Sequence, residues 1–353
     1  MSIHSSRGSP ELLHHLRAAV GPSADAHTQL IESVIPGLID SIGTIAIALR
    51  KAHHVSRAGS ANAFGDDQLN VDVLAEQAVR DAVANCPAVV TASSEEDPVE
   101  RPALPRTSAP APRKENDEAG GEEEEEEEEE EHYTVAFDPL DGSSIIAPNW
   151  TVGTIVGVWR GRTALRQDPA TRQVAAVLGV YGPRTTVVVA LRVPGRAPAC
   201  LELGLNERGA EDCTVVRAQV RLGSGGGSAR YFAPANLRAA SEDARYMELV
   251  SRFIRERYTL RYSGGLVPDV VHSLVKGHGV YVSPVTAGSK AKLRRLFELY
   301  PIALVMESAG GKAISPADGS RILDRALEDL NETAGLVCGT AEDVEIVRAA
   351  LVG

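Results

Sequence analysis

The sequence reads Phe137-Asp138-Pro139-Leu140-Asp141-Gly142-Ser143-Ser144 directly after a short apolar run, Tyr133 to Phe137, which predicts a buried strand. Two carboxylates three residues apart can point at one spot, because the proline between them fixes one backbone angle. The glycine and two serines that follow offer N–H groups and hydroxyls in a tight turn, which suits an anion. Carboxylate oxygens beside anion donors predict Mg²⁺ that bridges a phosphate. The alternative is an Asp-Pro turn capped by Asp141, which is common in loops.

Two further acidic groups lie upstream of this stretch. Ser94-Glu95-Glu96 follows a predicted strand, Ala88 to Ala92, and adjacent carboxylates there gain from a cation or a shared proton. Gly65-Asp66-Asp67-Gln68 is followed by Asp72, where apolar residues take up helical spacing, so we expect a loop that runs into a helix. The alternative for the Glu-Glu pair is a solvated acidic turn.

A fourth group lies near the C-terminal end, in the stretch Lys290 to Glu298. Lys292, Arg295 and Glu298 fall within two turns of a predicted helix, which mixes phosphate-binding cations with a candidate metal ligand. Taken by itself, the same pattern is that of an ordinary charged helix face.

The order of these groups resembles that of the fructose-1,6-bisphosphatases and their relatives, from about residue 28 to the C-terminus with one insertion. The order continues through Arg261-Tyr262-Ser263-Gly264-Gly265, Lys292-Leu293-Arg294 and the stretch from Val305 to Gly311. The Asp-Pro-x-Asp-Gly-Ser core is shared across the wider lithium-sensitive sugar and inositol phosphatase superfamily. The stretches that look closer to the sedoheptulose-1,7-bisphosphatase branch are Asn62–Gln68, Gly153–Trp159, Tyr181–Thr186, Tyr258–Asp269 and Ser289–Arg294.

The resemblance implies an α/β fold of the layered sugar-phosphatase type, with mixed sheets sandwiched between helices. It implies an N-terminal metal-site subdomain over residues 28–222 and a C-terminal sugar-phosphate-binding subdomain over 229–353, with the glycine-rich run 223–228 between them. From the pattern of apolar residues we expect strands at Val152–Trp159, Val187–Val193, Gly279–Val282 and Ile302–Met306, and helices at Ser241–Arg257 and Lys290–Leu299.

The resemblance also implies roles for individual residues. Two or more Mg²⁺ ions, for which Mn²⁺ can substitute, would be held by Glu95, Asp138, the carbonyl of Leu140, Asp141 and Glu298. The catalytic groups near the attacking water would be Asp72 and Glu96, with Asp66 on a loop that closes over the metals. The substrate-binding residues would be Gly142, Ser143, Ser144, Asn236, Arg261, Tyr262 and Lys292. Arg261 matches the position that reaches into the neighbouring subunit's site, which implies a homodimer or homotetramer.

The formal net charge of −12 is concentrated in one segment, residues 97–131, which holds fifteen Asp or Glu and four Lys or Arg. Ten consecutive Glu end this segment, and its prolines and like-charge repulsion predict a disordered, solvated insertion. It is either neutral to function or a docking tail for basic partners. The rest of the chain is nearly neutral and has no basic patch interleaved with aromatic residues, so nucleic acid is not an expected partner.

Residues 28–53 are the most apolar part of the chain, but charged and polar residues interrupt them, so no membrane span is expected. Their helical stripe predicts a core-facing helix bent near Pro36-Gly37: Leu30, Val34, Leu38, Ile42, Ile45 and Leu49. We expect a cytoplasmic protein, with a short organelle transit peptide as the alternative.

The four cysteines show no spacing typical of a zinc or redox site, which predicts isolated thiols in a reducing compartment: Cys86, Cys200, Cys213 and Cys338. Chloroplast relatives carry a cysteine pair just before the Gly-Asp loop, whereas residues 54–61 here contain none. A thioredoxin switch of that kind is therefore not expected.

The expected reaction is Mg²⁺-dependent hydrolysis of the 1-phosphate of sedoheptulose-1,7-bisphosphate to sedoheptulose 7-phosphate and phosphate. The alternatives are a fructose-1,6-bisphosphatase, an enzyme that accepts both bisphosphates, and a catalytically silent sugar-phosphate sensor.

Overall fold

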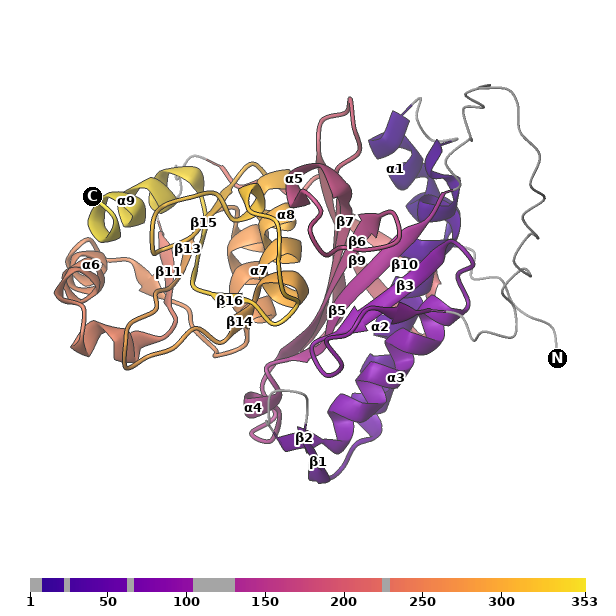
Figure 1. Ribbon diagram of the computed structural model, residues 1–353, viewed down its shortest axis with the longest axis horizontal. Helices are drawn as coiled ribbons and strands as arrows, with labels where there is room; N and C mark the ends of the chain where they lie inside the picture. The colour runs from indigo at the N-terminus through magenta and orange to yellow at the C-terminus, as the bar shows by residue number, and fades with distance from the viewer. Residues whose placement is uncertain (1–7, 22–25, 62–66, 104–130, 224–228) are drawn as a thin grey trace, which may run out of the picture.

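The computed structural model describes residues 8–21, 26–61, 67–103, 131–223 and 229–353. Two large mixed sheets alternate with layers of helices, so that each sheet is packed between helices (Figure 1). This arrangement confirms the predicted α/β layered fold. Asp66 and residues 104–130, which include most of the Glu run, lie outside the described residues.

The larger sheet has eight strands in the order β10-β9-β8-β7-β6-β5-β3-β4. Neighbouring strands are antiparallel except β3 and β5, which run parallel. The strands that were predicted at Val152–Trp159 and Val187–Val193 are found as β6 and β8. The bounds are β3 Val89–Ser94, β4 Arg101–Pro102, β5 Tyr133–Asp141, β6 Val152–Arg160, β7 Gln173–Tyr181, β8 Thr185–Leu191, β9 Ala199–Asn206 and β10 Gly209–Arg217.

The second sheet has five strands in the order β12-β11-β13-β17-β15. The strand predicted at Gly279–Val282 is β13. The bounds are β11 Tyr231–Pro234, β12 Thr259–Leu260, β13 Val280–Ser283, β15 Lys312–Ile314 and β17 Leu336–Gly339. Two small antiparallel pairs of strands are also described: β1 Arg57–Ala61 with β2 Asp67–Leu69, and β14 Leu293–Arg294 with β16 Thr333–Ala334.

The helices form three layers around the two sheets (Figure 1). One face of the larger sheet is covered by α1 Pro10–Val20, α2 Ile35–Lys51 and α3 Asn70–Ala84. Between the sheets lie α7 Leu266–Lys276 and α8 Tyr300–Ser308, and the outer face of the smaller sheet packs against α6 Ala244–Arg255 and α9 Ala341–Leu351. The short elements are α4 Ser143–Ile146, α5 Pro169–Arg172, 3₁₀ turns at Leu237–Ser241 and Ile322–Asp324, and π-helical turns at Leu30–Val34 and Arg295–Leu299.

The helical segment Leu30–Lys51 is long and apolar enough to cross a membrane, but 72% of its most apolar window is buried inside the protein. Every member of the predicted stripe is buried except Leu49, which is half-buried. Near Pro36-Gly37, where the sequence predicted a bend, the structure has a π-helical turn that ends just before Ile35. Pro36 therefore stands in the first turn of α2, where its missing N–H is tolerated.

Two elements differ from the prediction. Ile302–Met306, predicted as a strand, lies in the helix α8, whose residues are buried almost all round because it is packed between the two sheets. A short apolar run of this kind does not distinguish a buried helix from a buried strand. Residues 290–299, predicted as one helix, form the short strand β14 and then a π-helical turn, so Lys292 precedes the turn that carries Glu298.

Both ends of the predicted acidic insertion are ordered, so its predicted extent of 97–131 is too long. Arg101–Pro102 forms β4 against β3, and Asp97 makes an ion pair with Arg101. At the other end, the Glu131 carboxylate accepts hydrogen bonds from the backbone N–H groups of Gln29 and Leu30, both at 3.0 Å. Glu131 therefore caps the first turn of the buried helical segment.

Replacement of residues 104–130 by a short Gly-Ser linker is expected to leave the melting temperature and kcat at 0.15 M salt nearly unchanged. Ala103 N donates to Val90 O and Tyr133 N donates to Ala88 O, so the two ends of the replaced stretch lie beside the same strand, β3. A long loop that joins neighbouring points can be shortened at little cost in closure entropy. Thermal denaturation and steady-state kinetics of the two proteins check this, and loss of folding would show that residues 104–130 are structural.

The four cysteines are buried and unpaired, as predicted. Burial raises the pKa of all four thiols, that of Cys200 to about 12, so little reactive thiolate is present at neutral pH. We expect the same kcat for reduced and mildly oxidised protein. Several-fold activation by a dithiol reductant would contradict this prediction.

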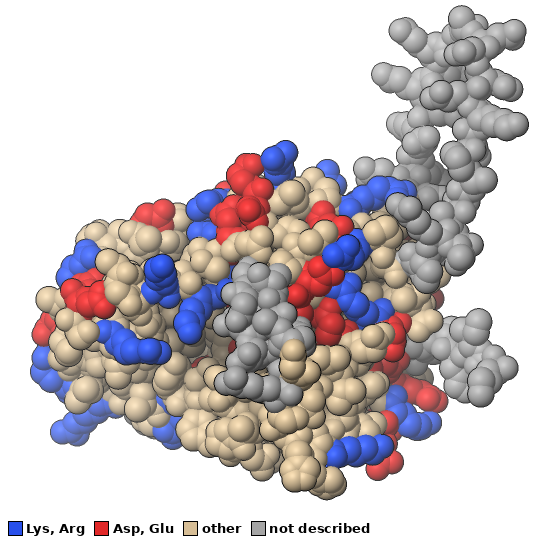
Figure 2. Space-filling model, turned by 60° about the horizontal axis from the view of Figure 1, so that its bottom comes forward, with Lys and Arg blue, Asp and Glu red and all other residues tan. Residues whose placement is uncertain are grey.

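On the face shown in Figure 2, Lys and Arg side chains are interspersed with Asp and Glu, and the lower margin of this face is largely uncharged.

Candidate metal centre

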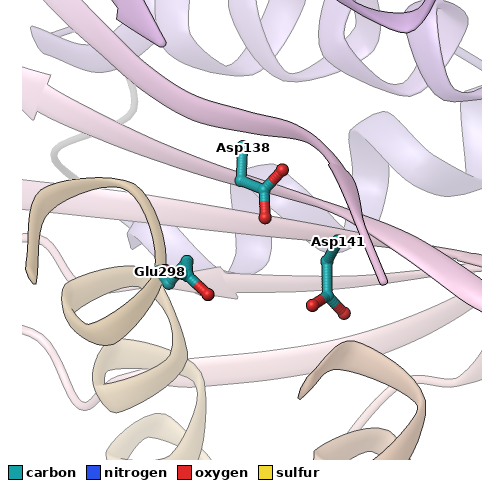
Figure 3. A group of neighbouring side chains, drawn as sticks. All are labelled: Asp138, Asp141 and Glu298. Atoms are coloured by element: carbon teal, nitrogen blue, oxygen red, sulfur yellow. The ribbon is translucent and has the colours of Figure 1, made fainter. Parts of the chain in front are cut away.

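Strand β5 carries the motif Asp138-Pro139-Leu140-Asp141, and every residue of the strand is buried. Residues three apart in a regular strand point to opposite faces. Here the pairing of β5 with β6 shifts register between Asp138 and Asp141, and such a bulge re-aims side chains. The strand therefore extends further than the predicted Tyr133–Phe137, and its irregularity brings both carboxylates to one side (Figure 3).

Glu298 completes the cluster from a distant part of the chain. It stands in the π-helical turn Arg295–Leu299, and its carboxylate accepts a hydrogen bond from the backbone N–H of Arg294. One oxygen each of Asp138, Asp141 and Glu298 lies within 4.8 Å of the others, and Figure 3 shows the three side chains directed at a common space. The structure thus brings together three of the five predicted metal ligands.

Burial raises the pKa of all three carboxyl groups. The pKa values of Asp138 and Glu298 are raised well above the usual range, by burial first and then by the charge of Glu95. The pKa of Asp141 is raised to about 6. Like charges held this close in a buried site repel each other. The donor set consists of hard carboxylate oxygens, so the residues fit a divalent cation of the Mg²⁺ type, which would relieve the repulsion.

The predicted ligand Glu95 lies close to the cluster, because β3 runs parallel to β5 and the two strands end at the same edge of the sheet. Glu95 N donates to Phe137 O at 3.0 Å, and Arg294 Nη2 lies 3.5 Å from Glu95 Oε1. Leu140 is buried, and its N–H donates to Asp138 Oδ1 at 3.0 Å. These positions are compatible with the predicted ligand roles, which remain predictions.

Asp72 lies in the first turn of α3, where the sequence predicted a loop entering a helix. It is buried, accepts a hydrogen bond from Leu69 N at 2.8 Å, and its other oxygen has no hydrogen-bond partner among the described residues. Burial, and to a smaller extent the charge of Glu96, raises the pKa of Asp72 to about 6. Asp72 and Glu96 therefore lie near each other.

The anion cradle predicted after Asp141 forms the start of α4. Gly142 has a φ of +90°, a left-handed conformation that favours glycine, and Ser143 and Ser144 open the short helix. Ser143 is half-buried and Ser144 is exposed. The hydroxyls and N–H groups of this turn thus lie directly after the metal-cluster residue Asp141 in the chain.

The predicted residues for the distal phosphate come from three segments of the chain. Arg261 and Tyr262 line a cavity of about 980 Å³ whose lining does not include the three clustered carboxylates. Lys292 is exposed, and Asn236 ties two loops together, since it donates to Pro284 O at 2.6 Å and accepts from the Ser289 hydroxyl.

Arg294 is a residue of the site whose role was missed from the sequence. It is buried, its backbone N–H binds Glu298 and its guanidinium lies beside Glu95. The stretch Lys292-Leu293-Arg294 was noted as a motif, but residues 290–299 were predicted as one helix. The structure instead has the strand β14 followed by a π-helical turn, and this change of backbone direction places Arg294 between two carboxylates.

Two family models and several known proteins match this chain. The family models of the fructose-1-6-bisphosphatase C-terminal and N-terminal domains match residues 227–352 and 114–202. A chloroplastic sedoheptulose-1,7-bisphosphatase of Triticum aestivum is 37% identical over 308 residues, which cover 86% of this chain and 69% of that protein. That of Chlamydomonas reinhardtii is 38% identical over 83% of this chain and 65% of its own. The class 1 fructose-1,6-bisphosphatase of Syntrophotalea carbinolica is 34% identical, over 82% of this chain and 80% of its own.

Two solved structures superpose on almost the whole chain. The crystal structure of a "Putative Sedoheptulose-1,7 bisphosphatase" from Toxoplasma gondii superposes with a TM-score of 0.79 at 34% identity, covering 97% of this chain and 98% of that one. The fructose-1,6-bisphosphatase of Leishmania major in its holo form, at 24% identity and a TM-score of 0.76, shares the fold. The match spans about two thirds of the length of the plant and algal relatives, 69% and 65%. The chain belongs to the fructose-1,6-bisphosphatase family, whose members are sugar bisphosphatases.

Proposed function

We propose that this protein hydrolyses the 1-phosphate of sedoheptulose-1,7-bisphosphate with the aid of Mg²⁺, and releases sedoheptulose 7-phosphate and phosphate. The observation that carries the proposal is the buried cluster of Asp138, Asp141 and Glu298, whose oxygens lie within 4.8 Å of one another. Family membership supports a sugar bisphosphate as the substrate, and the similarity to sedoheptulose-1,7-bisphosphatases favours the seven-carbon sugar.

In this proposal the three clustered carboxylates, Glu95 and the carbonyl of Leu140 hold two or more Mg²⁺ ions, and Mn²⁺ can take their place. When bound, such ions polarise the phosphoryl oxygens and stabilise the attacking and leaving oxygens of an in-line displacement. The chain's own part is to hold the carboxylate oxygens of the cluster rigidly. The backbone hydrogen bonds to Asp138, Asp141 and Glu298 fix the orientation of each carboxylate.

Asp72 and Glu96 act on the attacking water. A carboxylate accepts a proton best when its pKa is near the working pH, and burial raises that of Asp72 to about 6. Asp72 and Glu96 are therefore suited to share the proton that the water loses. Asp66, which directly precedes β2 in the sequence and lies outside the described residues, would have the family role of closing over the metals.

Substrate recognition is divided between two groups. Gly142, Ser143 and Ser144 hold the phosphoryl group that is transferred, and the distal phosphate and sugar are bound by Asn236, Tyr262 and Lys292. Arg261 acts across a subunit boundary, as its match to the family position that reaches into the neighbouring subunit's site implies. This requires at least a homodimer, or a homotetramer. The four unpaired thiols fit a reducing compartment, and we propose a cytoplasmic location.

The deciding experiment compares phosphate release from sedoheptulose-1,7-bisphosphate and fructose-1,6-bisphosphate in Mg²⁺ at matched concentrations. We expect a higher kcat/KM for the seven-carbon substrate. The reverse preference would make the protein a fructose-1,6-bisphosphatase, equal values would make it an enzyme of dual specificity, and no release from either would leave only the sensor.

A further inference from the structure

Two buried carboxylates, those of Asp141 and Asp269, accept backbone hydrogen bonds at the N-terminus of α7, each from a different part of the chain. Asp141 of the metal cluster accepts hydrogen bonds from Leu266 N at 3.1 Å and Val267 N at 2.6 Å, so both of its oxygens cap the helix. The helix can approach β6 this closely only because position 153 is glycine. A Cβ atom there would lie 2.4 Å from Cβ of Val267.

Asp269, one turn into the same helix, has no role in the reaction as described so far. Only 7% of its surface is exposed. Its Oδ1 accepts from Ser263 N at 2.7 Å and its Oδ2 from Gly264 N at 3.3 Å. The carboxylate thus points back along the chain and holds the turn 263–265, in which Gly264 has a φ of +101°.

Helix stability alone does not account for a carboxylate in this place. The N–H groups of Leu266 and Val267 are already bound by Asp141, and Asp269 uses both of its oxygens on the turn before the helix. Burial of a carboxylate is costly unless it is hydrogen-bonded. What the chain gains from Asp269 is therefore a fixed conformation of the turn.

The turn directly follows Arg261 and Tyr262, two of the residues proposed to bind substrate. Both line the cavity of about 980 Å³, and Asp269 lies in its wall. The guanidinium of Arg261 makes no ion pair with a carboxylate among the described residues; it lies 5.5 Å from the ring centre of Tyr231 and donates to Leu260 O. With so few side-chain contacts, the position of Arg261 depends on the backbone on either side of it.

We propose that Asp269 is a positioning residue for the substrate's distal phosphate: it fixes the turn 263–265 and thereby sets where Arg261 and Tyr262 are presented. This inference rests on the proposed function, which assigns sugar-phosphate binding to these two residues. Because α7 is also capped by Asp141, one helix end connects the metal cluster with the distal-phosphate residues.

The test is the variant Asp269→Asn. Asparagine has the same shape, but one of its two ends is an amide donor, which would face a backbone N–H group of the turn. We expect KM for the bisphosphate to rise about tenfold, while kcat at saturating substrate stays within about twofold of wild type. The rise in melting temperature that Mg²⁺ causes without substrate should be unchanged, because the metal cluster keeps its ligands.

Two further variants complete the test. Asp40→Asn is the matched control, since Asp40 also accepts a backbone hydrogen bond, from Ala210 N at 2.8 Å, but lies in α2 on the opposite face of the larger sheet. Its KM should equal that of wild type. Gly264→Ala strains the same turn without altering Asp269, so it should also raise KM, and it decides the matter if Asp269→Asn does not fold.

Wild-type KM in both Asp269→Asn and Gly264→Ala would overturn the inference. So would a loss of kcat in Asp269→Asn accompanied by loss of the Mg²⁺-induced stabilisation, because Asp269 would then act through the metal cluster. Failure of the proposed function looks different, since the wild-type protein itself would release no phosphate from either bisphosphate.

Discussion

Asp138→Asn is expected to lower kcat for sugar bisphosphate hydrolysis by at least about a thousandfold, with the fold intact. The amide keeps the size of the carboxylate but removes the negative charge that faces Asp141 and Glu298 across the cluster. Less charge means weaker binding of Mg²⁺ and weaker stabilisation of the phosphoryl group in the transition state. Steady-state phosphate release at saturating Mg²⁺ measures the effect, and circular dichroism verifies the fold.

Asp343→Asn is the matched control for this variant. Asp138 and Asp343 have equal exposed fractions, 3%, but Asp343 lies in α9 and accepts a hydrogen bond from the Tyr258 hydroxyl at 2.8 Å. The control should keep wild-type kcat even if it melts a few degrees lower. Near-wild-type turnover by Asp138→Asn at saturating Mg²⁺ would contradict the assignment of the metal centre.

The stabilisation that Mg²⁺ provides is expected to grow steeply with pH. Burial raises the pKa of Asp141 to about 6, and raises those of Asp138 and Glu298 well above their usual range. In the metal-free protein at low pH, these groups do not lower the free energy of unfolding, because they are protonated in both the folded and the unfolded state. As the pH rises above about 4, the unfolded carboxyl groups ionise first, so the folded state loses stability.

For Asp141 alone, this loss between about pH 4 and pH 6 amounts to about 3 kcal/mol, and the other two carboxyl groups extend it to higher pH. A bound cation removes the repulsion, so the difference in melting temperature with and without Mg²⁺ should be small at pH 5 and large at pH 8. Taking this difference removes the contributions of buried carboxyl groups outside the cluster. Values that do not change with pH would show that the cluster does not bind the ion.

The convergence of Asp138 and Asp141 could be predicted because Asp-Pro-x-Asp leaves the backbone few conformations. The parallel pairing of β3 with β5 then brings the end of β3, and with it Glu95, to the same edge. Local sequence and strand topology therefore both bring these carboxylates together. The strand β6, which is buried along almost its whole length, was likewise predicted from its local run of apolar residues.

Other features depend on contacts between distant parts of the chain. Whether Ile302–Met306 is a helix or a strand is decided by the two sheets that enclose α8, and no local pattern encodes them. The register shift in β5 arises in its pairing with β6. From the sequence, Asp269 was only the last residue of the stretch Tyr258–Asp269, and no role was assigned to it. Its importance depends on the fact that Asp141, more than a hundred residues away in sequence, already caps that helix.

The two-residue strand β4 has a consequence for solubility. Without it, β3 would end the larger sheet with a free row of backbone donors and acceptors, open to a strand from another molecule. Arg101 presents a charge at this border, and Pro102 has no N–H to offer, so β4 is a poor template for further strand addition. A shortened protein that also lacks residues 97–103 should therefore self-associate into aggregates, whereas one shortened only after Ala103 should stay dispersed.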